Sequence, residues 1–528
     1  MQIVIPMSGF GERFRRAGYD VPKPLIEVDG KSIIQYVVEM FPDNSDITFI
    51  CNKDHLNNEA YRMREILKNI SPNGRIVSIE PHKLGPVNAV LKAIDFLDLS
   101  KPIIVNYADF TCDWDFNEFC KVVERLDCDG AIPCYRGFHP HTLWSNYYAY
   151  VPEKDMVAQD IQEKKPFTKS PREEFASSGT YYFKSAEIMY YYFKKCVEED
   201  LTVGGEYYAS MAYKPMINDG LKIHVYELNH FMQWGTPADL EEYIYWSSIF
   251  KAILKEGSPP FLEGALMIPM VGLGSRFKNE GYETPKPLIN VSNKPMAIQA
   301  LLDLPKTDLQ KFIFRKDMDG LDELKKELLK SSSNPKFTNL DYMTDGQAST
   351  CVEGATDLEQ NKPITIAACD NGMICDSKLL KLLIDSNKAD VIVWAARGYP
   401  GAIRSPNMYG WIDSEKNGLI NSVSVKTPLS NPSIDPIIVG TFTFKKLSDF
   451  LYCVKKMKSR KGKVNGEYYV DSVINDAISL GLRCFVFEID QYICWGTPND
   501  LRTFKYWQSC FDGWNSHPYK IVNDENTK

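Results

Sequence analysis

Short apolar runs alternate with amphipathic stretches along the first part of the chain. Gln2–Pro6, Ile47–Cys51 and Pro102–Asn106 are short, mostly apolar segments of the kind that form buried strands. Between them, apolar residues recur at helical spacing in Ile33–Phe41 and Ala89–Leu97. The alternation predicts an α/β fold with a mostly parallel central sheet, helices on both faces, and ligands at the carboxyl ends of the strands.

Much of this pattern occurs twice with nearly the same residues. Ile5–Phe14 and Gly18–Ile26 match Ile268–Phe277 and Gly281–Ile289, each displaced by 263 (268 − 5). Later matches lie at an offset of 261, as for Gly346 and Gly85 (346 − 85). A long self-match at a nearly constant offset indicates a tandem duplication.

The repeat also suggests where the domains begin and end. The chain has 528 residues, so each half is long enough to bury its own core. We predict a first domain at 1–254, a linker at 255–264 that contains Gly-Ser-Pro-Pro, and a second domain at 265–512. The polar segment 513–528 is predicted to be a loose tail.

Composition excludes several classes of partner. The net charge is −8, from 61 basic and 69 acidic residues, and no long run of lysine or arginine occurs, which argues against nucleic acid. The thirteen cysteines include no Cys-x-x-Cys pair and favour reduced thiols in the cytoplasm over a zinc site or a disulfide framework. Met1 leads directly into a predicted strand, and no apolar run approaches about 18 residues, so neither export nor membrane insertion is expected.

Each repeat opens with residues suited to a polyphosphate. Two glycines spaced Gly-x-Gly let backbone N–H groups approach an anion, an arginine follows, and a lysine stands between two prolines that stiffen its backbone. These residues are Gly9, Gly11, Arg13 and Lys23 in the first repeat, and Gly272, Gly274, Arg276 and Lys286 in the second. A tight turn with exposed basic residues is the competing interpretation, but the double occurrence of the whole pattern favours phosphate.

The motif Gly-x-Gly-x-Arg-Phe followed by Pro-Lys-Pro-Leu-Ile resembles the signature of the sugar-1-phosphate nucleotidylyltransferases, also called nucleotide-sugar pyrophosphorylases. A dinucleotide-binding fingerprint is excluded, because Phe14 and Phe277 replace its third glycine. The resemblance implies two tandem Rossmann-like, GT-A-like domains. It also implies transfer of a nucleoside monophosphate from a triphosphate to a sugar-1-phosphate or related acceptor, with release of pyrophosphate, for nucleotide-sugar and polysaccharide synthesis.

Two further positions recur in both halves. The resemblance implies that Gly85 and Gly346, each in a turn before a predicted helix, lie against the nucleobase. Asp109 and Asp370 directly follow apolar strands and are candidate Mg²⁺ ligands, because nucleotide-bound magnesium needs only one or two carboxylates. An ordinary helix-start turn and a turn-capping aspartate are the competing interpretations.

The acceptor side differs between the repeats. The resemblance implies that a lysine meets the acceptor phosphate, a preceding glutamate meets a sugar hydroxyl, and a glycine lies nearby. These positions are Glu163, Lys164 and Gly179 in the first repeat, and Lys426 and Gly440 in the second. Val425 stands where the second repeat would need the glutamate, and valine cannot accept a hydrogen bond. The second site therefore binds something different or no sugar at all.

The second metal ligand of the resembled family is also replaced. An aspartate often stands just upstream of the closing Gly-Thr-Pro element, and Gln233 and Cys494 occupy that place here. Weaker substitutes are Glu206, Glu467 and Asp490.

No serine, cysteine or histidine occupies a common nucleophile position in both repeats, so the shared chemistry needs no covalent intermediate. Direct in-line attack by an ionised acceptor phosphate on the α-phosphorus fits these residues. Two alternatives stay open. One repeat, more plausibly the second, is a non-catalytic nucleotide-binding or regulatory module, or the chain is a glycosyltransferase of related fold that uses Asp113 and Asp115 on a nucleotide sugar.

Overall fold

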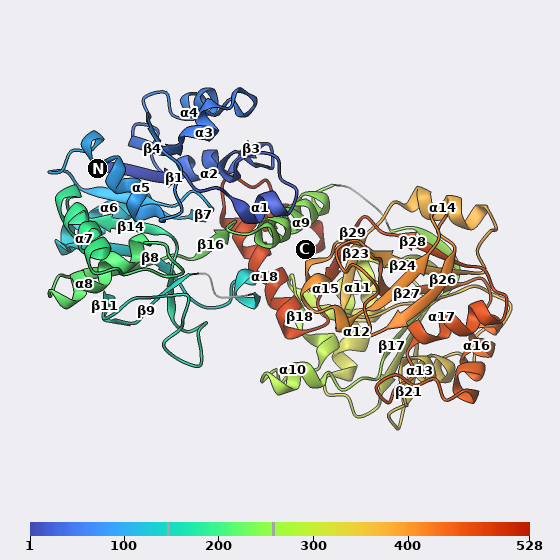
Figure 1. The fold of residues 1–528 in the computed structure, drawn as a ribbon. Coiled ribbons are helices and arrows are strands. Elements are labelled where there is room, and N and C mark those ends of the chain that lie inside the picture. The colour runs from blue at the N-terminus through green and yellow to red at the C-terminus, as the bar shows by residue number, and fades with distance from the viewer. Residues whose placement is uncertain (145–147, 256–258, 528) are drawn as a thin grey trace. The chain divides into compact units, whose positions relative to one another are not determined.

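The computed structural model describes residues 1–144, 148–255 and 259–527 (Figure 1). The chain divides into two compact units, Met1–Ile244 and Tyr245–Lys528. Each unit has a mixed sheet with helices packed on it. Both units are therefore α/β, as the alternation of apolar segments predicts.

The sheet of the first unit follows the path β10-β11-β15-β8-β14-β6-β1-β4-β5. β1 (Gln2–Met7) pairs in parallel with β4 and with β6, and β14 is antiparallel to both β6 and β8. The other strands of this path are β4 (Asp46–Asn52), β5 (Arg75–Ile79), β6 (Ile103–Asn106), β8 (Gly130–Tyr135), β10 (Glu153–Lys154), β11 (Val157–Ala158), β14 (Thr180–Phe183) and β15 (Ile223–Glu227). The parallel part was predicted, whereas the antiparallel strands after β6 were not.

Side chains cap free N–H groups at the start of α6 and α7, two of the longer helices of the first unit. The Asp115 carboxylate accepts from Glu118 N (2.9 Å) at the start of α6, and the Ser185 hydroxyl accepts from Ile188 N (3.2 Å) at the start of α7. The helices are α1 (Glu12–Arg16), α2 (Ile33–Glu39), α3 (Lys53–Asn57), α4 (Met63–Ile70), α5 (Pro86–Lys92), α6 (Phe116–Leu126), α7 (Ala186–Glu198), α8 (Tyr213–Asn218) and α9 (Pro237–Ile253). The apolar faces of α5, α7 and α8 pack with the strands in a buried core that includes Val4, Val105, Phe193 and Tyr213.

The second unit repeats this plan with the path β21-β20-β17-β22-β27-β24-β28. β17 (Phe261–Met270) is parallel to β20 and β22, and β27 runs antiparallel between β22 and β24. The other strands are β20 (Lys306–Arg315), β21 (Pro335–Leu340), β22 (Ile364–Ile366), β24 (Val391–Ala396), β27 (Ile437–Phe444) and β28 (Cys484–Glu488). The helices are α10 (Ser275–Asn279), α11 (Met296–Asp303), α12 (Leu321–Ser331), α13 (Gln347–Gly354), α14 (Ser377–Asp385), α15 (Pro400–Arg404), α16 (Leu447–Ser459), α17 (Val470–Ser479) and α18 (Pro498–Gly513).

The predicted boundaries need three corrections. The boundary between the compact units falls within α9, at 244/245 rather than at 254. β17 already begins at Phe261, so the last residues of the predicted linker belong to a strand. The segment after α18 is not loose, because His517 and Tyr519 are buried and the Tyr519 hydroxyl donates to Asp524 Oδ2 (2.9 Å). The polar composition of this segment gave no sign that His517 and Tyr519 are buried.

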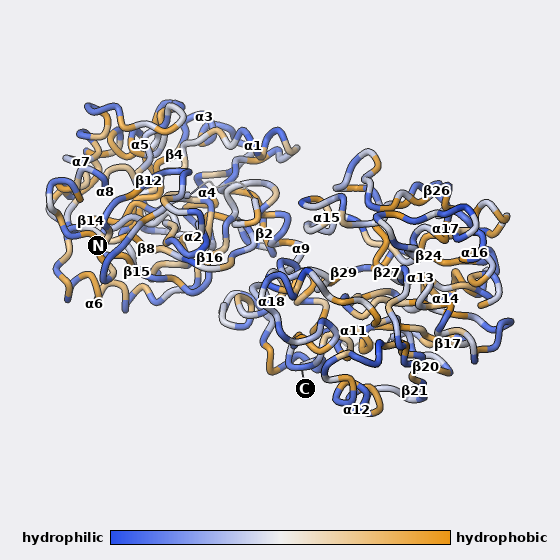
Figure 2. The backbone as a smooth tube through the Cα atoms, turned by 90° about the horizontal axis from the view of Figure 1, so that it is seen from below, coloured by the Kyte–Doolittle hydropathy of each residue, from blue (hydrophilic) through white to orange (hydrophobic). Residues whose placement is uncertain are grey.

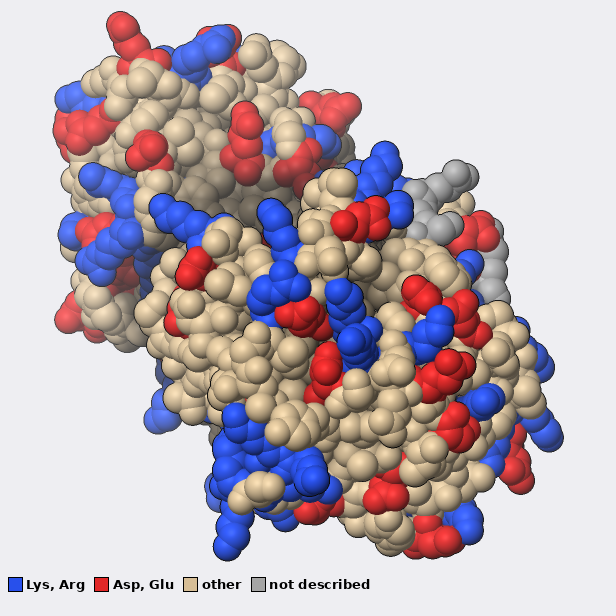
Figure 3. Space-filling view, turned by 90° about the vertical axis from the view of Figure 1, so that its right-hand side faces the viewer, with Lys and Arg blue, Asp and Glu red and all other residues tan. Residues whose placement is uncertain are grey.

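Burial follows hydropathy in both units. Figure 2 shows hydrophobic positions concentrated inside each unit and hydrophilic positions in the peripheral loops. On the face drawn in Figure 3, lysines and arginines are interspersed with aspartates and glutamates over most of the surface. Among the described residues, no helix combines the length and apolar character needed to cross a membrane.

Candidate active site

The loops that follow β1 and β6 begin at one edge of the first sheet, because these two strands are parallel neighbours. The loop after β1 leads into α1 through Gly11, whose φ of +62° is left-handed. A Cβ at this position would also lie 3.6 Å from the Lys23 Cβ. Glycine is therefore favoured here by the sharp turn of the chain, because a Cβ would make only ordinary contact with the lysine stem.

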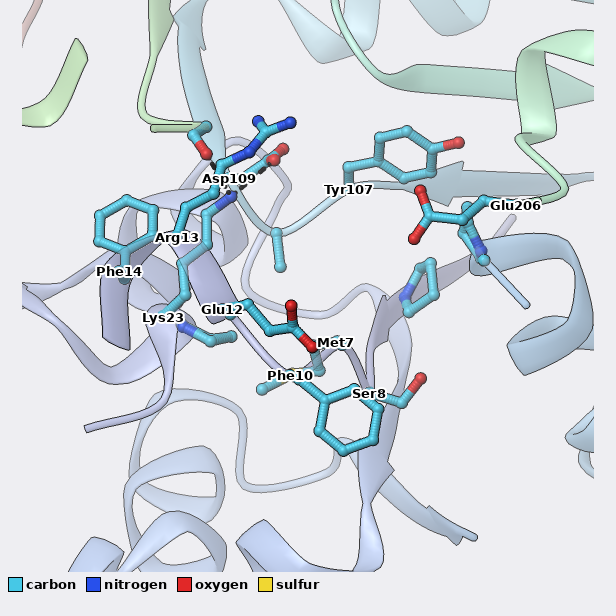
Figure 4. Close-up of a pocket in the computed structure, with 18 of the residues that line it drawn as sticks. Met7, Ser8, Phe10, Glu12, Arg13, Phe14, Lys23, Tyr107, Asp109 and Glu206 are labelled. Carbon is cyan, nitrogen blue, oxygen red and sulfur yellow. Dashed lines mark hydrogen bonds and ion pairs between the residues drawn. The ribbon is translucent and has the colours of Figure 1, made fainter. Parts of the chain in front are cut away.

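A cavity of about 550 Å³ opens at this edge of the sheet (Figure 4). This volume lies within the range of small-molecule sites. The structure brings six sequence-predicted residues together in the cavity lining: Gly9, Gly11, Arg13, Lys23, Gly85 and Asp109.

Lys23 and Asp109 form the central ion pair of the cavity. The Lys23 Nζ lies 2.8 Å from Asp109 Oδ2 and donates also to the carbonyl of Gly235 (3.3 Å). In Figure 4 the Arg13 side chain extends toward the same place. Two cations thus converge beside a single carboxylate, an arrangement that favours an anionic ligand with more than one charge.

The glycine before α5 is required by a close approach of two backbone segments. A Cβ at Gly85 would lie 2.7 Å from the carbonyl oxygen of Tyr207. Val87 N donates to that carbonyl (3.1 Å), and Tyr207 N donates to the carbonyl of Leu84 (3.0 Å). The duplicated Gly-Glu-Tyr-Tyr motif is therefore held against this turn and forms the opposite side of the cavity.

Three side chains of the cavity had no assigned role, or only a weak one, in the sequence. Tyr107, Glu206 and Tyr208 line it, and the Tyr208 hydroxyl donates to the Glu206 carboxylate. Burial and this hydrogen bond raise the Tyr208 pKa. Glu206 and Tyr208 could have been found, because Gly-Glu-Tyr-Tyr occurs in both repeats at the same offset. Tyr107 carries no such signal.

The second unit places its own copies in matching positions. Gly274 has φ +63°, and the Lys286 ammonium pairs with Asp370 and donates to the Gly496 carbonyl (3.0 Å). Burial alone would lower the Lys286 pKa, but Asp370 outweighs it and the pKa is raised. A Cβ on the loop residue Gly272 would have no atom within 4 Å, so this glycine lies at an open position.

The second turn-forming glycine also repeats. A Cβ at Gly346 would touch the backbone of Tyr468, and Ala348 N donates to the Tyr468 carbonyl (3.0 Å). The charge of Arg276 acts on Lys426 and on the Tyr469 hydroxyl. Arg276 therefore lies near the residues predicted to bind phosphate groups in this unit.

The predicted acceptor residues of the first unit lie next to the cavity rather than in its lining. Lys164 has φ +59° and donates from Nζ to the Tyr208 hydroxyl (2.8 Å). Gly179 has φ +102°, and its carbonyl accepts from Tyr107 N (3.0 Å). Each thus contacts a tyrosine that faces the cavity.

Glu163, the residue before the predicted acceptor lysine, is held by the protein. Its side chain is buried, with 8% of the residue exposed, and Ser210 Oγ donates to its Oε1. Burial raises the Glu163 pKa, although the Ser210 hydrogen bond lowers it. One carboxyl oxygen therefore already accepts a hydrogen bond from the protein, and a sugar hydroxyl would share this carboxyl group with Ser210.

In the second unit Lys426 also has a left-handed backbone, with φ +61°, and its Nζ donates to the Met408 carbonyl. Burial lowers the Lys426 pKa, partly offset by Asp471. Gly440 has φ +78°, and a Cβ there would lie 3.1 Å from Ala368 Cβ. These positions correspond to Lys164 and Gly179.

The residues around Asp109 fit magnesium chemistry as a partial set of ligands. A Cβ on Gly235 would touch the Gln233 amide and lie 3.6 Å from Asp109 Oδ2, so amide and carboxylate flank the same glycine. Carboxylate and amide oxygens suit Mg²⁺, which also takes phosphate and water oxygens. Within the described residues no group of three or more His, Cys, Asp or Glu side chains could hold a metal ion. The protein would supply only part of the coordination.

The second unit fits magnesium less well. A Cβ on Gly496 would lie 3.3 Å from both Cys494 Sγ and Asp370 Oδ2, so the thiol takes the place of the Gln233 amide. Burial raises the Cys494 pKa and keeps the thiol neutral. A neutral sulfur is a poor ligand for this hard cation.

Asp490 does not reach the second site. β23 (Asn371–Ile374) pairs with β29 (Gln491–Cys494) so that Asn371 is opposite Cys494 and Ile374 is opposite Gln491. Asp370 and Asp490 therefore lie at opposite ends of the ladder, roughly 17 Å apart along the strands. The suggestion that Asp490 replaces the second metal ligand is wrong.

The register also separates the Asp-x-Asp motif from the cavity. β7 (Phe110–Asp113) pairs with β16 (His230–Gln233), with Asp113 opposite His230 at the end away from Asp109. Asp115 is the N-cap of α6. Both carboxylates have local positions distant from the cation pair, which removes the basis for a glycosyltransferase that uses them.

Comparison with known proteins matches the first unit to a family. Residues 3–212 match the family model described as "Nucleotidyl transferase". A mannose-1-phosphate guanyltransferase from Neurospora crassa is 26% identical over 288 residues, which cover 52% of this chain and 73% of that protein. A bifunctional protein GlmU from Methanocaldococcus jannaschii is 24% identical over 247 residues, which cover 46% and 53%. The chain thus spans about half the length of this second relative.

Solved structures with a similar arrangement include a nucleoside-diphosphate-sugar pyrophosphorylase from Vibrio cholerae (21% identity, TM-score 0.39, 46% of this chain and 99% of that one). An inositol-1-phosphate CTP transferase from T. maritima shares 12% identity with a TM-score of 0.36 and covers 49% and 99%.

Proposed function

We propose, from the match of residues 3–212 to the nucleotidyl transferase family, that the chain is a sugar-phosphate nucleotidylyltransferase. It transfers a nucleoside monophosphate from a triphosphate to a sugar-1-phosphate or a related phosphorylated acceptor. The observation that carries the proposal is the cavity in which the glycine loop, Arg13, Lys23 and Asp109 surround one space. Its volume and its converging cations suit a nucleoside triphosphate.

Different residues of the first unit would bind different phosphate groups of the triphosphate. The N–H groups of the loop after β1 and the Arg13 guanidinium would bind the β- and γ-phosphates, while Lys23 would bind the α-phosphate. The Lys23–Asp109 pair keeps the carboxylate from repelling the incoming triphosphate. Magnesium, when bound by Asp109 and the Gln233 amide, would neutralise further phosphate charge.

The transfer itself needs no protein nucleophile. An oxygen of the acceptor phosphate forms a bond to the α-phosphorus while the bond from that phosphorus to the bridging oxygen breaks. The electron pair leaves with pyrophosphate, whose charge the loop and Arg13 stabilise. Because the acceptor phosphate is already ionised, no proton has to be removed from it.

The direct test is pyrophosphate release across the four common nucleoside triphosphates, each paired with a panel of phosphorylated acceptors. We expect release above background for at least one pair, dependent on Mg²⁺. The proposal fails if no pair releases pyrophosphate although the chain is folded. The identity of base and sugar would follow from the productive pair.

A second candidate concerns the second unit alone. It would bind a triphosphate without turning it over, and Cys494 beside Asp370 favours this interpretation because the thiol does not help to hold magnesium. Asp109→Asn would then abolish turnover by the full chain, whereas Asp370→Asn would leave it unchanged. Equal losses in both variants would reject a purely regulatory second unit.

We also propose that the protein functions in a reducing compartment such as the cytoplasm. All thirteen cysteines are free thiols in the structure, and most are buried. Free thiols are the usual state in reducing compartments.

A further inference from the structure

The acceptor segments of the two units have the same backbone arrangement. In β9 (Ala149–Val151), Ala149 pairs with Glu163 of β12 (Gln162–Glu163). In the second unit, Gly410 pairs with Val425, the last residue of β26. The residue after each pair is a left-handed lysine whose N donates to a tyrosine carbonyl at 3.0 Å, Lys164 to Tyr148 and Lys426 to Tyr409. The residues of the two pairs are therefore equivalent one to one.

A third position completes the comparison. Ser210, in the 3₁₀ turn η5 (Ala209–Ala212), donates to Glu163 in the first unit. Its counterpart at an offset of 261 (471 − 210) is Asp471, in the first turn of α17. α17 is fixed on β26 (Ile420–Val425), because Asn475 accepts from Val423 N (2.9 Å) and donates to the Val423 carbonyl (2.8 Å). Asp471 is thereby held close to the end of β26.

Gly410 leaves the space that the Asp471 carboxylate occupies. A Cβ on Gly410 would touch Asp471 Oδ2 and would lie 3.1 Å from Ile438 Cδ1. The backbone of Gly410 is not left-handed, so space rather than φ explains the glycine. At the equivalent position the first unit has Ala149, whose methyl group fills this volume.

The two units therefore differ at three neighbouring positions, and the differences at these positions fit together. The first unit has alanine, glutamate and serine at these positions, and the second has glycine, valine and aspartate. Each set contains one carboxyl group close to the acceptor lysine. The carboxyl comes from a strand in the first unit and from a helix in the second.

We propose that Asp471 is the specificity-determining residue of the second acceptor site, where its carboxylate binds a hydroxyl group of a phosphorylated sugar whose phosphate lies on Lys426. This inference rests on the proposed function and assigns the hydroxyl-binding group that Val425 cannot provide. Asp471 is partly exposed, whereas Glu163 is buried on Ser210.

Charge links Asp471 to the same site as the lysine. Asp471 and Asp370 each act on Lys426 electrostatically, so the carboxylate, the ammonium and the predicted magnesium ligand lie near one another. Because the carboxyl group approaches from α17 rather than from the strand, it would meet a different hydroxyl. The two units would then prefer different sugar phosphates.

Binding to the full-length chain tests the proposal, with Lys164→Ala included to weaken the first acceptor site. Calorimetry would compare inorganic phosphate, which has no sugar hydroxyl, with glucose-1-phosphate, mannose-1-phosphate and galactose-1-phosphate. Asp471→Asn should weaken the tightest sugar phosphate by about 10-fold, because a neutral amide oxygen replaces a charged hydrogen-bond acceptor. Inorganic phosphate should bind equally well or more tightly, because a negative charge near Lys426 is removed.

Asp413→Asn is the matched control, since this exposed aspartate lies on β25 (Gly410–Ser414) three residues from Gly410. It should leave both affinities within about 2-fold. Equal weakening of phosphate and sugar phosphate by Asp471→Asn would mean a structural role and would overturn the proposal. So would a second site that binds no sugar phosphate more tightly than inorganic phosphate.

The exchange can also be reversed. The triple variant Gly410→Ala, Val425→Glu, Asp471→Ser gives the second unit the side chains of the first. It should shift the order of sugar-phosphate affinities toward that measured for the first unit in a Lys426→Ala chain, and an unchanged order would contradict the inference. Failure of the proposed function would show separately, as absent pyrophosphate release by the unmodified chain while sugar binding still depends on Asp471.

Discussion

The two units hold the same cation–carboxylate pair but surround it differently. Lys23 with Asp109 and Lys286 with Asp370 occupy equivalent places, and each lysine also donates to a carbonyl of the closing Gly-Thr-Pro element. The side chain beside each aspartate differs, an amide in the first unit and a thiol in the second. The pair and the glycines of the loop before it are the same in both units, whereas the side chain beside the aspartate differs.

A second difference between the units lies beside the strands that follow Asp109 and Asp370. Met40 ends α2 in the first unit, and its counterpart Asp303 ends α11 in the second. Asp303 Oδ2 accepts from Met373 N (3.2 Å) and occupies the space left by Gly372, where the first unit has Thr111. Here too a carboxylate and a glycine occur together in the second unit, and the glycine provides the volume that the carboxylate needs.

Removing the ion pairs should have the largest effect on the comparison. Lys23→Ala or Asp109→Asn should lower pyrophosphate release by roughly 10²- to 10³-fold, because each removes a charge placed at the reacting phosphates. Lys286→Ala and Asp370→Asn should do the same to any activity of the second unit. Initial rates at saturating substrate measure the loss, with circular dichroism to check folding. Full activity in both first-unit variants would reject the assignment.

Alanine substitution of the two turn-forming glycines should have the next largest effect, a loss of stability. Gly85→Ala or Gly346→Ala combines a left-handed φ with a collision against a tyrosine backbone, which should cost about 3 kcal/mol of the free energy of unfolding. Gly137→Ala is the control, because Gly137 has φ +84° but nothing within 4 Å of a Cβ, and should cost only about 1 kcal/mol. Urea denaturation measures the three values. Equal losses in all three variants would show that the positive φ alone, and not the collision with the tyrosine backbone, causes the loss of stability.

The pH dependence of stability should distinguish the second unit through Asp303. Burial raises the Asp303 pKa to about 7, although the hydrogen bond from Met373 N lowers it. Between the unfolded pKa of about 4 and the folded value, the folded state holds a proton that the unfolded state has lost, so stability falls as pH rises. Asp303→Asn should therefore stabilise the protein by up to about 4 kcal/mol at pH 8 and by nothing below pH 4.

Thermal unfolding at several pH values would measure this effect, as a rise of up to about 8 to 16 °C in Tm at pH 8. The exposed Asp322→Asn on α12 is the control and should not change the pH profile. A stabilisation by Asp303→Asn that is the same at pH 4 and pH 8 would contradict the assignment.

The smallest expected effect is on magnesium. Cys494→Asp places a second carboxylate beside Asp370, so magnesium-dependent nucleotide binding by the second unit should strengthen several-fold, about 1 kcal/mol. Cys494→Ser removes the thiol without adding charge and should change little. Titration of Mg²⁺ at fixed triphosphate, in a chain carrying Asp109→Asn, measures both. Equal responses of the two variants would mean that position 494 does not face the metal.

Much of the molecule was predictable because the relevant signals are local. Apolar runs and helical spacing predicted the parallel strands around β1, since burial of a segment is written in its own residues. Likewise Gly11, Lys23 and Asp109 follow strand ends, and parallel strands bring their ends to one edge. The antiparallel strands after β6 and the buried segment after α18 were missed, because their pairing and burial depend on distant partners.

The sequence by itself determined the internal repeat, the α/β class and part of the lining of the first cavity, including Arg13, Lys23 and Asp109. Only the tertiary structure decided the surroundings of the other carboxyl groups. Ser210 donates a hydrogen bond to Glu163, Asp490 lies far from Asp370, and Asp471 lies near Lys426. The physical reason is that an alignment of repeats compares one position with its counterpart. A carboxyl group in a folded site, however, can come from whichever neighbouring element has room for it.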